Sequence, residues 1–293
     1  MRPLGIAAGM IKQLSHVPKG LEQLVDHITF GSFTLKPRDG NKEPVYWFDE
    51  ERQASINAVG LKNQGLPAFL DEMVTHEAQF RELIDAGCKI RLSLAPLVAG
   101  ELIEMVKILY AYKEIVSWLI HEVEYNAACP NHRSDGGKLH DVLAHDPIAL
   151  KALMKEGSLY TGRKAIKIAP YMNPESLFKC VVNATMFGFD TIVSGNTLKQ
   201  SSIIGGVQRL SVDQGGMAGT PLLKSGVEQV SYLKALTNRI VETQRPNITG
   251  CGGIMNAPSA RKYLDAGADT GQVATYYMQY GVNGVRDLVS ELV

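Results

Sequence analysis

The sequence contains few cysteines, and their spacing fits neither a disulfide framework nor a metal site. Its 293 residues include only Cys88, Cys129, Cys180 and Cys251, which are far apart and form no C-x-x-C pair. Small secreted scaffolds and zinc modules use close, paired cysteines. We therefore expect reduced thiols in a cytoplasmic protein, with no disulfide and no bound metal.

Long apolar runs and an excess of charge of one sign are also missing. No stretch reaches the roughly 18 consecutive apolar residues of a membrane-spanning helix, and the beginning, MRPLGIAAGMIKQ, does not have the pattern of a signal peptide. Lys plus Arg and Asp plus Glu number 30 each, which gives no support for nucleic acid or an anionic membrane as a partner. We expect no stable membrane anchor and a small, nearly neutral ligand.

Short apolar segments alternate with longer segments of helical periodicity, such as residues 227–243, along the whole chain. This alternation is typical of βα units that build a parallel sheet. Eight segments are expected to be strands: residues 3–8, 27–32, 89–95, 118–126, 164–169, 189–195, 247–250 and 270–275. Eight such units predict an α/β fold, a (β/α)8 TIM barrel, with residues 1–293 as a single domain.

Several element boundaries can be identified from the sequence. Asp146, Asn173 and Asn256 each stand one or two residues before a proline that suits the first helical turn, so we expect helices to begin there. Residues 35–65 and 198–220 are too long for simple βα loops. We expect them to be insertions after the second and sixth strands that act as lids or ligand walls.

Small and polar residues follow the expected strands. In a barrel of this kind the loops at the carboxyl ends of the strands form the active site. GCGG at residues 250–253 follows the seventh strand, and Ala274 and Thr275 follow the eighth. Glycines let backbone N–H groups approach a ligand closely, and a helix start favours an anion. We expect a phosphate site here, for a cofactor or for a phosphorylated substrate.

Eight short motifs occur in order along the chain. They are AAGMIK (7–12), GSFTLKPRDGNKEP (31–44), INAVGLKNQG (56–65), NAACPN (126–131), IKIAPYMNPE (166–175), SGNT (194–197), GGMAGTPLL (215–223) and GCGGI (250–254). In this order they resemble the motifs of the dihydroorotate dehydrogenases, FMN-dependent barrels of pyrimidine biosynthesis. The resemblance implies a flavoprotein oxidoreductase that acts on a CH–CH bond and oxidises dihydroorotate to orotate.

The resemblance assigns one group of residues to FMN. Lys167 matches a lysine beside the N1/O2 edge of the flavin, where a fixed cation stabilises the negative charge of the reduced ring. Four glycines and one threonine, which stand last in the group, are expected around the phosphate. The whole group is Ala8, Gly9, Ser32, Ser93, Asn126, Lys167, Ala274, Gly216, Gly219, Gly252, Gly253 and Thr275.

A second group is implied for the substrate, in which asparagines predominate because a pyrimidine ring needs side chains that both donate and accept hydrogen bonds. This group is Lys12, Asn57, Gly60, Leu61, Asn126, Asn131, Asn196 and Thr197. Cys129 matches the catalytic base, which takes the C5 proton of dihydroorotate while hydride leaves C6 for flavin N5. A thiol titrates nearer neutrality than a serine hydroxyl and suits this role.

The chain combines features of two classes within this family. A cysteine base such as Cys129 belongs to the cytosolic class, but Phe30 stands where that class carries its active-site lysine. Lys12 after the first strand and Gly31-Ser32 after the second match the quinone-dependent class, whose amphipathic N-terminal helices find no counterpart before the first strand here. The electron acceptor stays open among fumarate, NAD through an accessory subunit, and quinone, and a homodimer is one candidate assembly.

Other functions remain open as well. The chain could be a related FMN barrel that acts on a different small ring, or a catalytically silent relative that binds FMN or a pyrimidine. A flavin-free lyase is disfavoured, because a phosphate site alone has no need of Lys167. A silent protein could lose Cys129 and Lys12 freely, so their presence favours catalysis.

The remaining cysteines and histidines have simpler interpretations. Cys88, Cys180 and Cys251 are expected to be inert core thiols, since free cysteine is among the most buried residue types. His140 and His145 are five residues apart and miss the i, i+4 spacing that places two ligands on one helix face. We expect them on the surface rather than at a metal.

Overall fold

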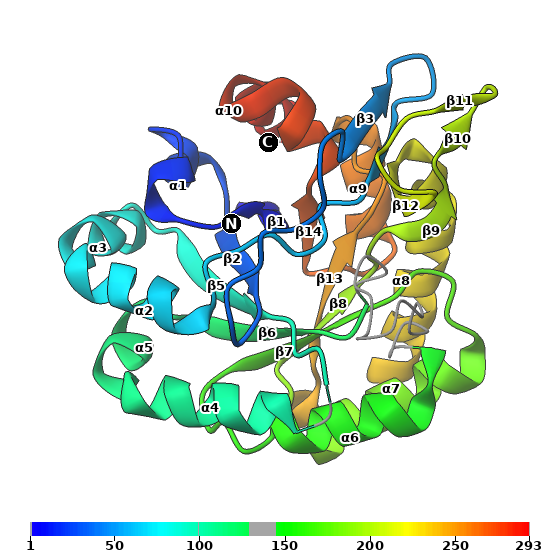
Figure 1. Cartoon of the computed structure of the whole chain (residues 1–293). Helices are drawn as coiled ribbons and strands as arrows, with labels where there is room; N and C mark the ends of the chain where they lie inside the picture. The colour runs from blue at the N-terminus through cyan, green and yellow to red at the C-terminus, as the bar shows by residue number, and fades with distance from the viewer. Residues whose placement is uncertain (1, 99, 129–144, 293) are drawn as a thin grey trace.

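The computed structural model describes residues 2–98, 100–128 and 145–292 and contains a closed barrel of eight parallel strands surrounded by helices (Figure 1). The barrel strands are β1 (Leu4–Ile11), β2 (His27–Phe33), β5 (Lys89–Leu94), β6 (Glu122–Asn126), β7 (Lys164–Ile168), β8 (Thr191–Ser194), β13 (Asn247–Cys251) and β14 (Thr270–Val273). Each strand pairs with the next in chain order, and β14 pairs with β1 to close the barrel. The predicted (β/α)8 fold is confirmed.

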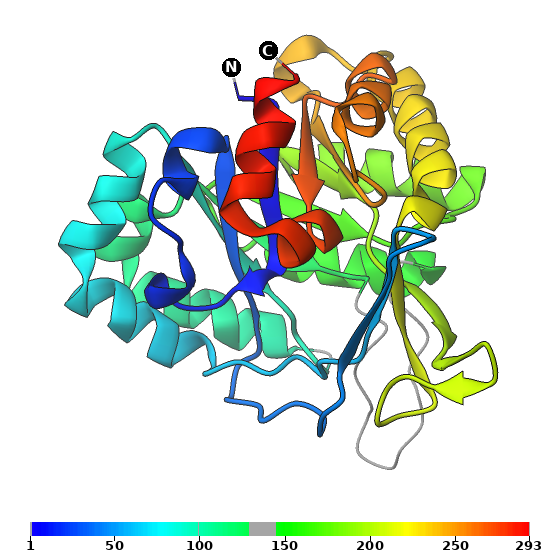
Figure 2. The same ribbon diagram turned by 90° about the horizontal axis from the view of Figure 1, so that it is seen from above.

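Helices between the strands cover the outside of the barrel (Figures 1 and 2). They are α1 (Leu21–Leu24), α2 (Leu66–Thr75), α3 (Glu77–Asp85), α4 (Glu101–Ala111), α5 (Lys113–Leu119), α6 (Pro147–Gly157), α7 (Pro174–Met186), α8 (Leu223–Thr237), α9 (Ala257–Asp265) and α10 (Thr275–Ser290), with 3-10 turns η1 (Leu14–His16), η3 (Thr220–Leu222) and η4 (Glu242–Gln244). None of these described helices is long and apolar enough to cross a membrane.

Three helix starts agree with the sequence. The side chains of Asp146, Asn173 and Asn256 accept hydrogen bonds from backbone N–H groups in the first turns of α6, α7 and α9. These bonds satisfy donors that have no partner inside the helix. The starts predicted from the Asx and proline pattern are confirmed.

Two predicted boundaries are wrong. The strand expected at residues 118–126 begins only at Glu122, because Trp118 and Leu119 end helix α5. A short apolar run of this kind fits a helix end and a buried strand equally well. The helix expected at residues 227–243 is α8, which begins earlier, at Leu223, and ends at Thr237.

The two insertions form one sheet outside the barrel. Its strands are β3 (Tyr46–Asp49) and β4 (Ala54–Asn57) from the first insertion and β9 (Leu198–Ser201) and β12 (Gln214–Gly219) from the second; a hairpin of β10 (Ile203–Ile204) and β11 (Val207–Gln208) extends the second insertion. β4 and β12 pair antiparallel, with Gly216 opposite Asn57. Figure 2 shows this sheet projecting beside one end of the barrel. Both insertions expected from the sequence are present, and they contribute strands to one shared sheet.

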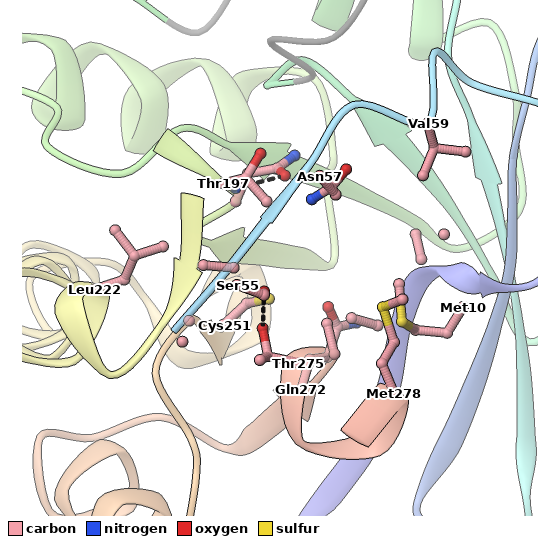
Figure 3. A pocket seen from close by; sticks show the side chains of 18 of the residues that line it. Met10, Ser55, Asn57, Val59, Thr197, Leu222, Cys251, Gln272, Thr275 and Met278 are labelled. Carbon is pink, nitrogen blue, oxygen red and sulfur yellow. Dashed lines mark hydrogen bonds between the residues drawn. The ribbon is translucent and has the colours of Figure 1, made fainter. Parts of the chain in front are cut away.

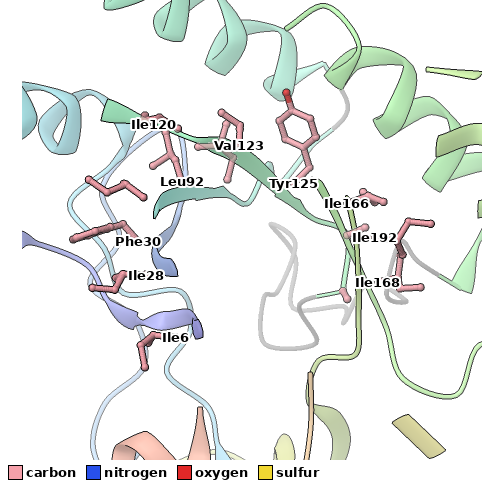
Figure 4. Packing of buried hydrophobic residues seen from close by; sticks show 14 of the residues in the cluster. Ile6, Ile28, Phe30, Leu92, Ile120, Val123, Tyr125, Ile166, Ile168 and Ile192 are labelled. Carbon is pink, nitrogen blue, oxygen red and sulfur yellow. The ribbon is translucent and has the colours of Figure 1, made fainter. Parts of the chain in front are cut away.

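The outward faces of the barrel strands are apolar and pack on the helices (Figure 4). Phe33 of β2 stacks on Phe69 of α2 with ring centroids 4.3 Å apart. Tyr125 of β6 donates a hydrogen bond from its hydroxyl to the carbonyl oxygen of Gly157 at the end of α6, at 3.1 Å. Alternate residues thus point to the helices and bury the surface that holds the barrel together.

The inward faces of the same strands are largely polar. Arg91 of β5 and Glu122 of β6 form a buried ion pair, with Nε and Oε2 2.9 Å apart. Thr191 of β8 donates to the other oxygen of Glu122 at 2.7 Å. Buried charges are costly unless they are paired, and in this layer the pairing runs between neighbouring strands. The Oε1 atom of the buried Glu124 has no hydrogen-bond partner among the described residues.

Candidate active site

A pocket opens at the carboxyl ends of the barrel strands, next to the four-stranded sheet of the insertions. Its wall combines the ends of several barrel strands with β4 and the start of α10. Figure 3 shows side chains from these elements around it. The predicted site residues that line it are Ala8, Gly9, Lys12, Ser32, Asn57, Gly60, Leu61, Asn126, Lys167, Asn196, Thr197, Gly219, Gly252, Gly253, Ala274 and Thr275.

Lys167 places a buried cation in the pocket wall. It lies on β7, is 3% exposed, and donates from Nζ to Oε1 of Gln272 at 3.3 Å. Burial lowers the pKa of Lys167, but the nearby Cys251 and Glu124 act in the opposite direction and prevail, so the pKa lies above its ordinary value. Burial raises the pKa of Cys251 despite the nearby lysine. At neutral pH Cys251 is therefore a neutral thiol, and the nearby Glu124 is the group that favours the ammonium form of Lys167.

Three asparagines reach the pocket from three separate segments. Asn126, at the end of β6, donates from Nδ2 to Ser32 Oγ at 3.0 Å and accepts at Oδ1 from Asn196 Nδ2 at 3.3 Å. Asn57 of β4 donates from Nδ2 to the carbonyl oxygen of Gly216 at 3.2 Å. These bonds fix which face of each amide points to the pocket, so a ligand meets donors and acceptors in a set order.

The glycines after β13 bring backbone groups to the pocket. Gly252 and Gly253 have φ angles of 120° and 77°. A Cβ on Gly253 would lie 2.6 Å from the backbone nitrogen of Leu223, at the start of α8. Only glycine permits so close an approach in this conformation.

The start of α10 lies on the same side of the pocket. Thr275, its first residue, shares a hydrogen bond with Ser55 of β4, with the two hydroxyl oxygens 2.9 Å apart (Figure 3). The helical run that begins at Thr275 is interrupted by the non-helical Gly281, but the first turn of any helix has N–H groups without a partner inside the helix. Together with the glycine turn after β13, it can bind an anionic group such as a phosphate.

The end of β1 forms another part of the wall. Gly9 has a φ of 97°, and no atom lies within 4 Å of the position that a Cβ would occupy. Flat ring systems can therefore lie directly against this backbone. Lys12, just beyond the strand, donates from Nζ to the carbonyl oxygen of Lys62 at 2.7 Å, next to Gly60 and Leu61.

Among the described residues, two predicted site residues do not line the pocket themselves. Ser93 lies behind Ser32, with their hydroxyl oxygens 2.8 Å apart, so it supports the wall rather than forming it. Gly216 acts through its carbonyl oxygen, which accepts from Asn57. Cys129 and Asn131 lie outside the described residues.

The pocket also contains residues that the sequence did not single out. Cys251, interpreted as an inert core thiol, lies in the wall close to Lys167. Gln272 of β14 lines the pocket and accepts from Lys167. Gln272 had a signal: it is a polar residue at an inward position of a buried strand, since side chains alternate between the two faces of β14. Cys251 also had a signal, because it lies within the GCGG segment at residues 250–253 that was expected at the site, whereas Cys180 lies in no such motif.

The closed parallel barrel and its pocket at the carboxyl ends of the strands define the class of (β/α)8 enzymes. The sequence model of the family described as dihydroorotate dehydrogenase matches residues 1–293. The chain belongs to the dihydroorotate dehydrogenase family, whose members are oxidoreductases acting on CH–CH bonds. The resemblance drawn from the eight motifs is confirmed.

Individual relatives agree with this membership. The chain is 26% identical over 276 residues to a "dihydroorotate dehydrogenase (quinone)" of Chromobacterium violaceum, covering 92% of this chain and 76% of the relative. It is 27% identical over 299 residues to the protein of the same name in Shewanella pealeana, covering 98% and 82%. A solved DHODH of Eimeria tenella in complex with ferulenol shares the fold, with a TM-score of 0.77, 19% identity, and coverage of 99% of this chain and 80% of that one.

Proposed function

We propose that this protein oxidises dihydroorotate to orotate with bound FMN. The observation that carries the proposal is the meeting of a buried ammonium group, Lys167, with Asn57, Asn126 and Asn196 in one pocket. Within a family of dihydroorotate dehydrogenases, this is the set of groups that a reduced flavin and a pyrimidine ring require.

The pocket fits FMN in charge and in shape. Lys167 offers a cation for the edge of the flavin that becomes negative on reduction. The glycine turn at Gly252 and Gly253 and the start of α10 offer N–H groups for the phosphate. Gly9 leaves open space for the flat ring. When bound, FMN supplies an acceptor for hydride.

The three asparagines are suited to hold the substrate ring. The amide of Asn126 is held at both ends, by Ser32 and by Asn196, so it does not reorient when substrate arrives. A fixed amide pays little entropy on binding. Lys12 lies at the same pocket and provides a cation for the carboxylate of dihydroorotate.

We assign the proton transfer to Cys129, which matches the base of the family. The described backbone stops at Ala128, which is fully buried and donates from its N–H to Asn126 Oδ1 at 3.1 Å. Asn126 itself lines the pocket, which supports a role at the pocket for Cys129, the residue after Ala128. In this role the thiolate accepts the C5 proton as hydride leaves C6, and the C5–C6 double bond forms.

The names of the relatives favour quinone as the electron acceptor. The Chromobacterium violaceum and Shewanella pealeana proteins are both called quinone enzymes. Lys12 and the Gly31-Ser32 pair match that class as well. We therefore expect a soluble quinone analogue to reoxidise the reduced protein faster than fumarate or NAD does.

The experiment is anaerobic addition of dihydroorotate to the purified protein. We expect the purified protein to be yellow and to lose this colour after dihydroorotate is mixed in, because the bound flavin is reduced. Lys167→Met should slow flavin reduction by about 10²- to 10³-fold, the usual effect of removing one charge-stabilising donor. Lys164→Met, on the same strand at the far end of the barrel, is the matched control and should bleach at the normal rate. A protein that cannot be loaded with FMN, or a yellow protein that never bleaches, contradicts the proposal.

A further inference from the structure

A line of hydrogen bonds crosses the barrel interior from Lys167 to the opposite end. Lys167 donates to Gln272 Oε1 at 3.3 Å, and Gln272 Nε2 lies 3.1 Å from His27 Nε2. His27 Nδ1 lies 3.0 Å from Asp26 Oδ2, and the other oxygen of Asp26 accepts from Lys89 at 2.8 Å. The line joins the barrel strands β7, β14, β2 and β5, and Asp26 immediately precedes β2.

The protonation of His27 follows from its neighbours. A carboxylate oxygen only accepts hydrogen bonds, so His27 Nδ1 must carry the hydrogen in its contact with Asp26. Arg91 Nη1, 3.3 Å from His27 Nε2, can only donate. Burial, and then the charge of Arg91, lower the pKa of His27 to about 3. The ring is therefore neutral, with Nε2 as an acceptor.

Most of the surroundings of His27 do not stabilise a second proton on its ring. Gly5 of β1 packs on the ring, where an added Cβ would lie 2.3 Å from it, and brings no charged group. Besides Asp26, the charges that act most on the ring are those of Arg91 and Lys89 of β5, which both oppose protonation. Glu124 of β6 lies one residue further away, against Gln272.

The orientation of Gln272 is then fixed. Its Nε2 faces the ring acceptor His27 Nε2 at 3.1 Å and the carboxylate oxygen Glu124 Oε2 at 3.5 Å. It also lies 3.4 Å from Thr29 Oγ1, a hydroxyl that can accept. Its Oε1 faces the ammonium group of Lys167. A flipped amide would place an NH₂ group against a cation and an oxygen against a carboxylate, which costs several hydrogen bonds in a buried site.

We propose that Asp26, His27 and Gln272 are positioning residues for Lys167. Asp26 selects the His27 tautomer, His27 selects the orientation of the Gln272 amide, and the amide oxygen holds the ammonium group at the pocket wall. This rests on the proposed function, in which that ammonium group faces the flavin. None of the three needs to touch substrate, and only Gln272 reaches the pocket.

The first test uses the protein without FMN. Nitrogen-15 NMR of the histidine rings, with the His27 signals assigned by their absence in His27→Gln, reports which ring nitrogen carries hydrogen. We expect hydrogen on Nδ1 alone, at pH 7 and still at pH 5. Hydrogen on Nε2 at either pH overturns the proposal, because Gln272 would then be turned around.

The second test measures the reduction potential of bound FMN, which a purely structural role in the barrel would not change selectively. His27→Leu and Gln272→Leu should lower the potential by about 30 mV or more, a tenfold fall in the ratio of reduced to oxidised flavin. His27→Gln keeps an acceptor near the Nε2 position and should recover most of the wild-type value. Thr249→Val, a buried interior change next to Arg91 but off the line, is the control and should leave the potential unchanged.

The outcomes separate this inference from the proposed function. Equal potentials in wild type, His27→Leu and Gln272→Leu overturn the positioning role, even though dihydroorotate bleaches all of them. If His27→Leu does not fold, Gln272→Leu decides alone. A protein that takes up no FMN overturns the proposed function and the flavin role of Lys167 together, whereas the ring state of His27 still decides whether the hydrogen-bond order is correct.

Discussion

Individual cysteines in this chain differ in what their surroundings allow them to do. Burial raises the pKa of Cys88 and of Cys180 to about 12, so both stay protonated at neutral pH. Such thiols are neither nucleophiles nor bases. Cys251 stays a thiol for the same reason, although it lies close to Lys167. Of these three, only Cys251 touches the candidate pocket, and none is suited to accept a proton from a substrate.

Substitution of Cys129 therefore tests directly whether this thiol is the catalytic base. Cys129→Ala should keep FMN bound but slow its reduction by dihydroorotate about 10²- to 10⁴-fold, the usual contribution of a general base. Cys129→Ser should be intermediate and more active at higher pH, because a hydroxyl is harder to deprotonate. Stopped-flow reduction without oxygen measures both.

The matched control is Cys88→Ala, which removes a buried thiol at the other end of the barrel. The FMN of Cys88→Ala should be reduced by dihydroorotate at the wild-type rate. If Cys129→Ala reduces as fast as Cys88→Ala, Cys129 is not the base, and the proton must go to another group.

At the scale of elements, the turn after β13 is the feature on which phosphate binding depends. Gly253→Ala would place a methyl group 2.6 Å from the Leu223 nitrogen at a φ of 77°, so the turn must shift away from the start of α8. We expect the Kd for FMN to rise at least tenfold, which corresponds to about 1.4 kcal/mol. Fluorescence quenching of added FMN gives the affinity.

Gly205→Ala controls for backbone strain alone. Gly205 has a φ of 61° in the turn between β10 and β11, and no atom lies within 4 Å of an added Cβ. It also does not line the pocket. Its FMN affinity should match wild type. Equal affinities in the two variants would show that the turn after β13 does not hold the phosphate.

Local signals predicted the elements that depend on local bonds. The starts of α6, α7 and α9 follow from one capping side chain and a nearby proline, so the sequence located them correctly. The joint sheet of the two insertions depends on Gly216 pairing with Asn57, which lie far apart in the chain. No local pattern encodes such a pairing, and only its components could be expected.

The candidate site shows the same division. Family motifs identified Lys167 and four asparagines, and the structure brings Lys167 together in one pocket with the three asparagines that it describes, Asn57, Asn126 and Asn196. They did not identify Gln272 or His27, because a polar residue inside a strand has no evident role until its partners across the barrel are known. The alternation of inward polar and outward apolar residues could have indicated both.

At the scale of the whole molecule, the polar barrel interior links stability to pH. Burial and the charge of Arg91 lower the pKa of His27 to about 3 in the folded protein, against 6.5 for the ordinary side chain. Desolvation also lowers the pKa of His121 to about 4, with nearby Arg163 adding to the effect, although His121 is exposed at the surface. An unfolded chain therefore takes up protons on acidification that the folded chain does not, and acid favours unfolding.

The sign and size can be stated for His27. Its contribution to stability is fully present above pH 6.5 and is lost as the pH falls from there towards 3. Between pH 7 and pH 5 the free energy of unfolding should fall by about 2 kcal/mol from this residue alone, at about 1.4 kcal/mol per pH unit. Urea denaturation at the two pH values measures the change.

Variants at two histidines isolate this residue. His27→Gln should be less stable than wild type at pH 7 but should lose about 2 kcal/mol less on going to pH 5, because it has no ring to protonate. His16→Gln, at an exposed position, should show the full wild-type loss. If His27→Gln and wild type lose the same free energy of unfolding between the two pH values, His27 is not the group whose protonation destabilises the barrel in acid. The neutral His27 ring on which the order of the hydrogen-bonded line depends would then also be contradicted.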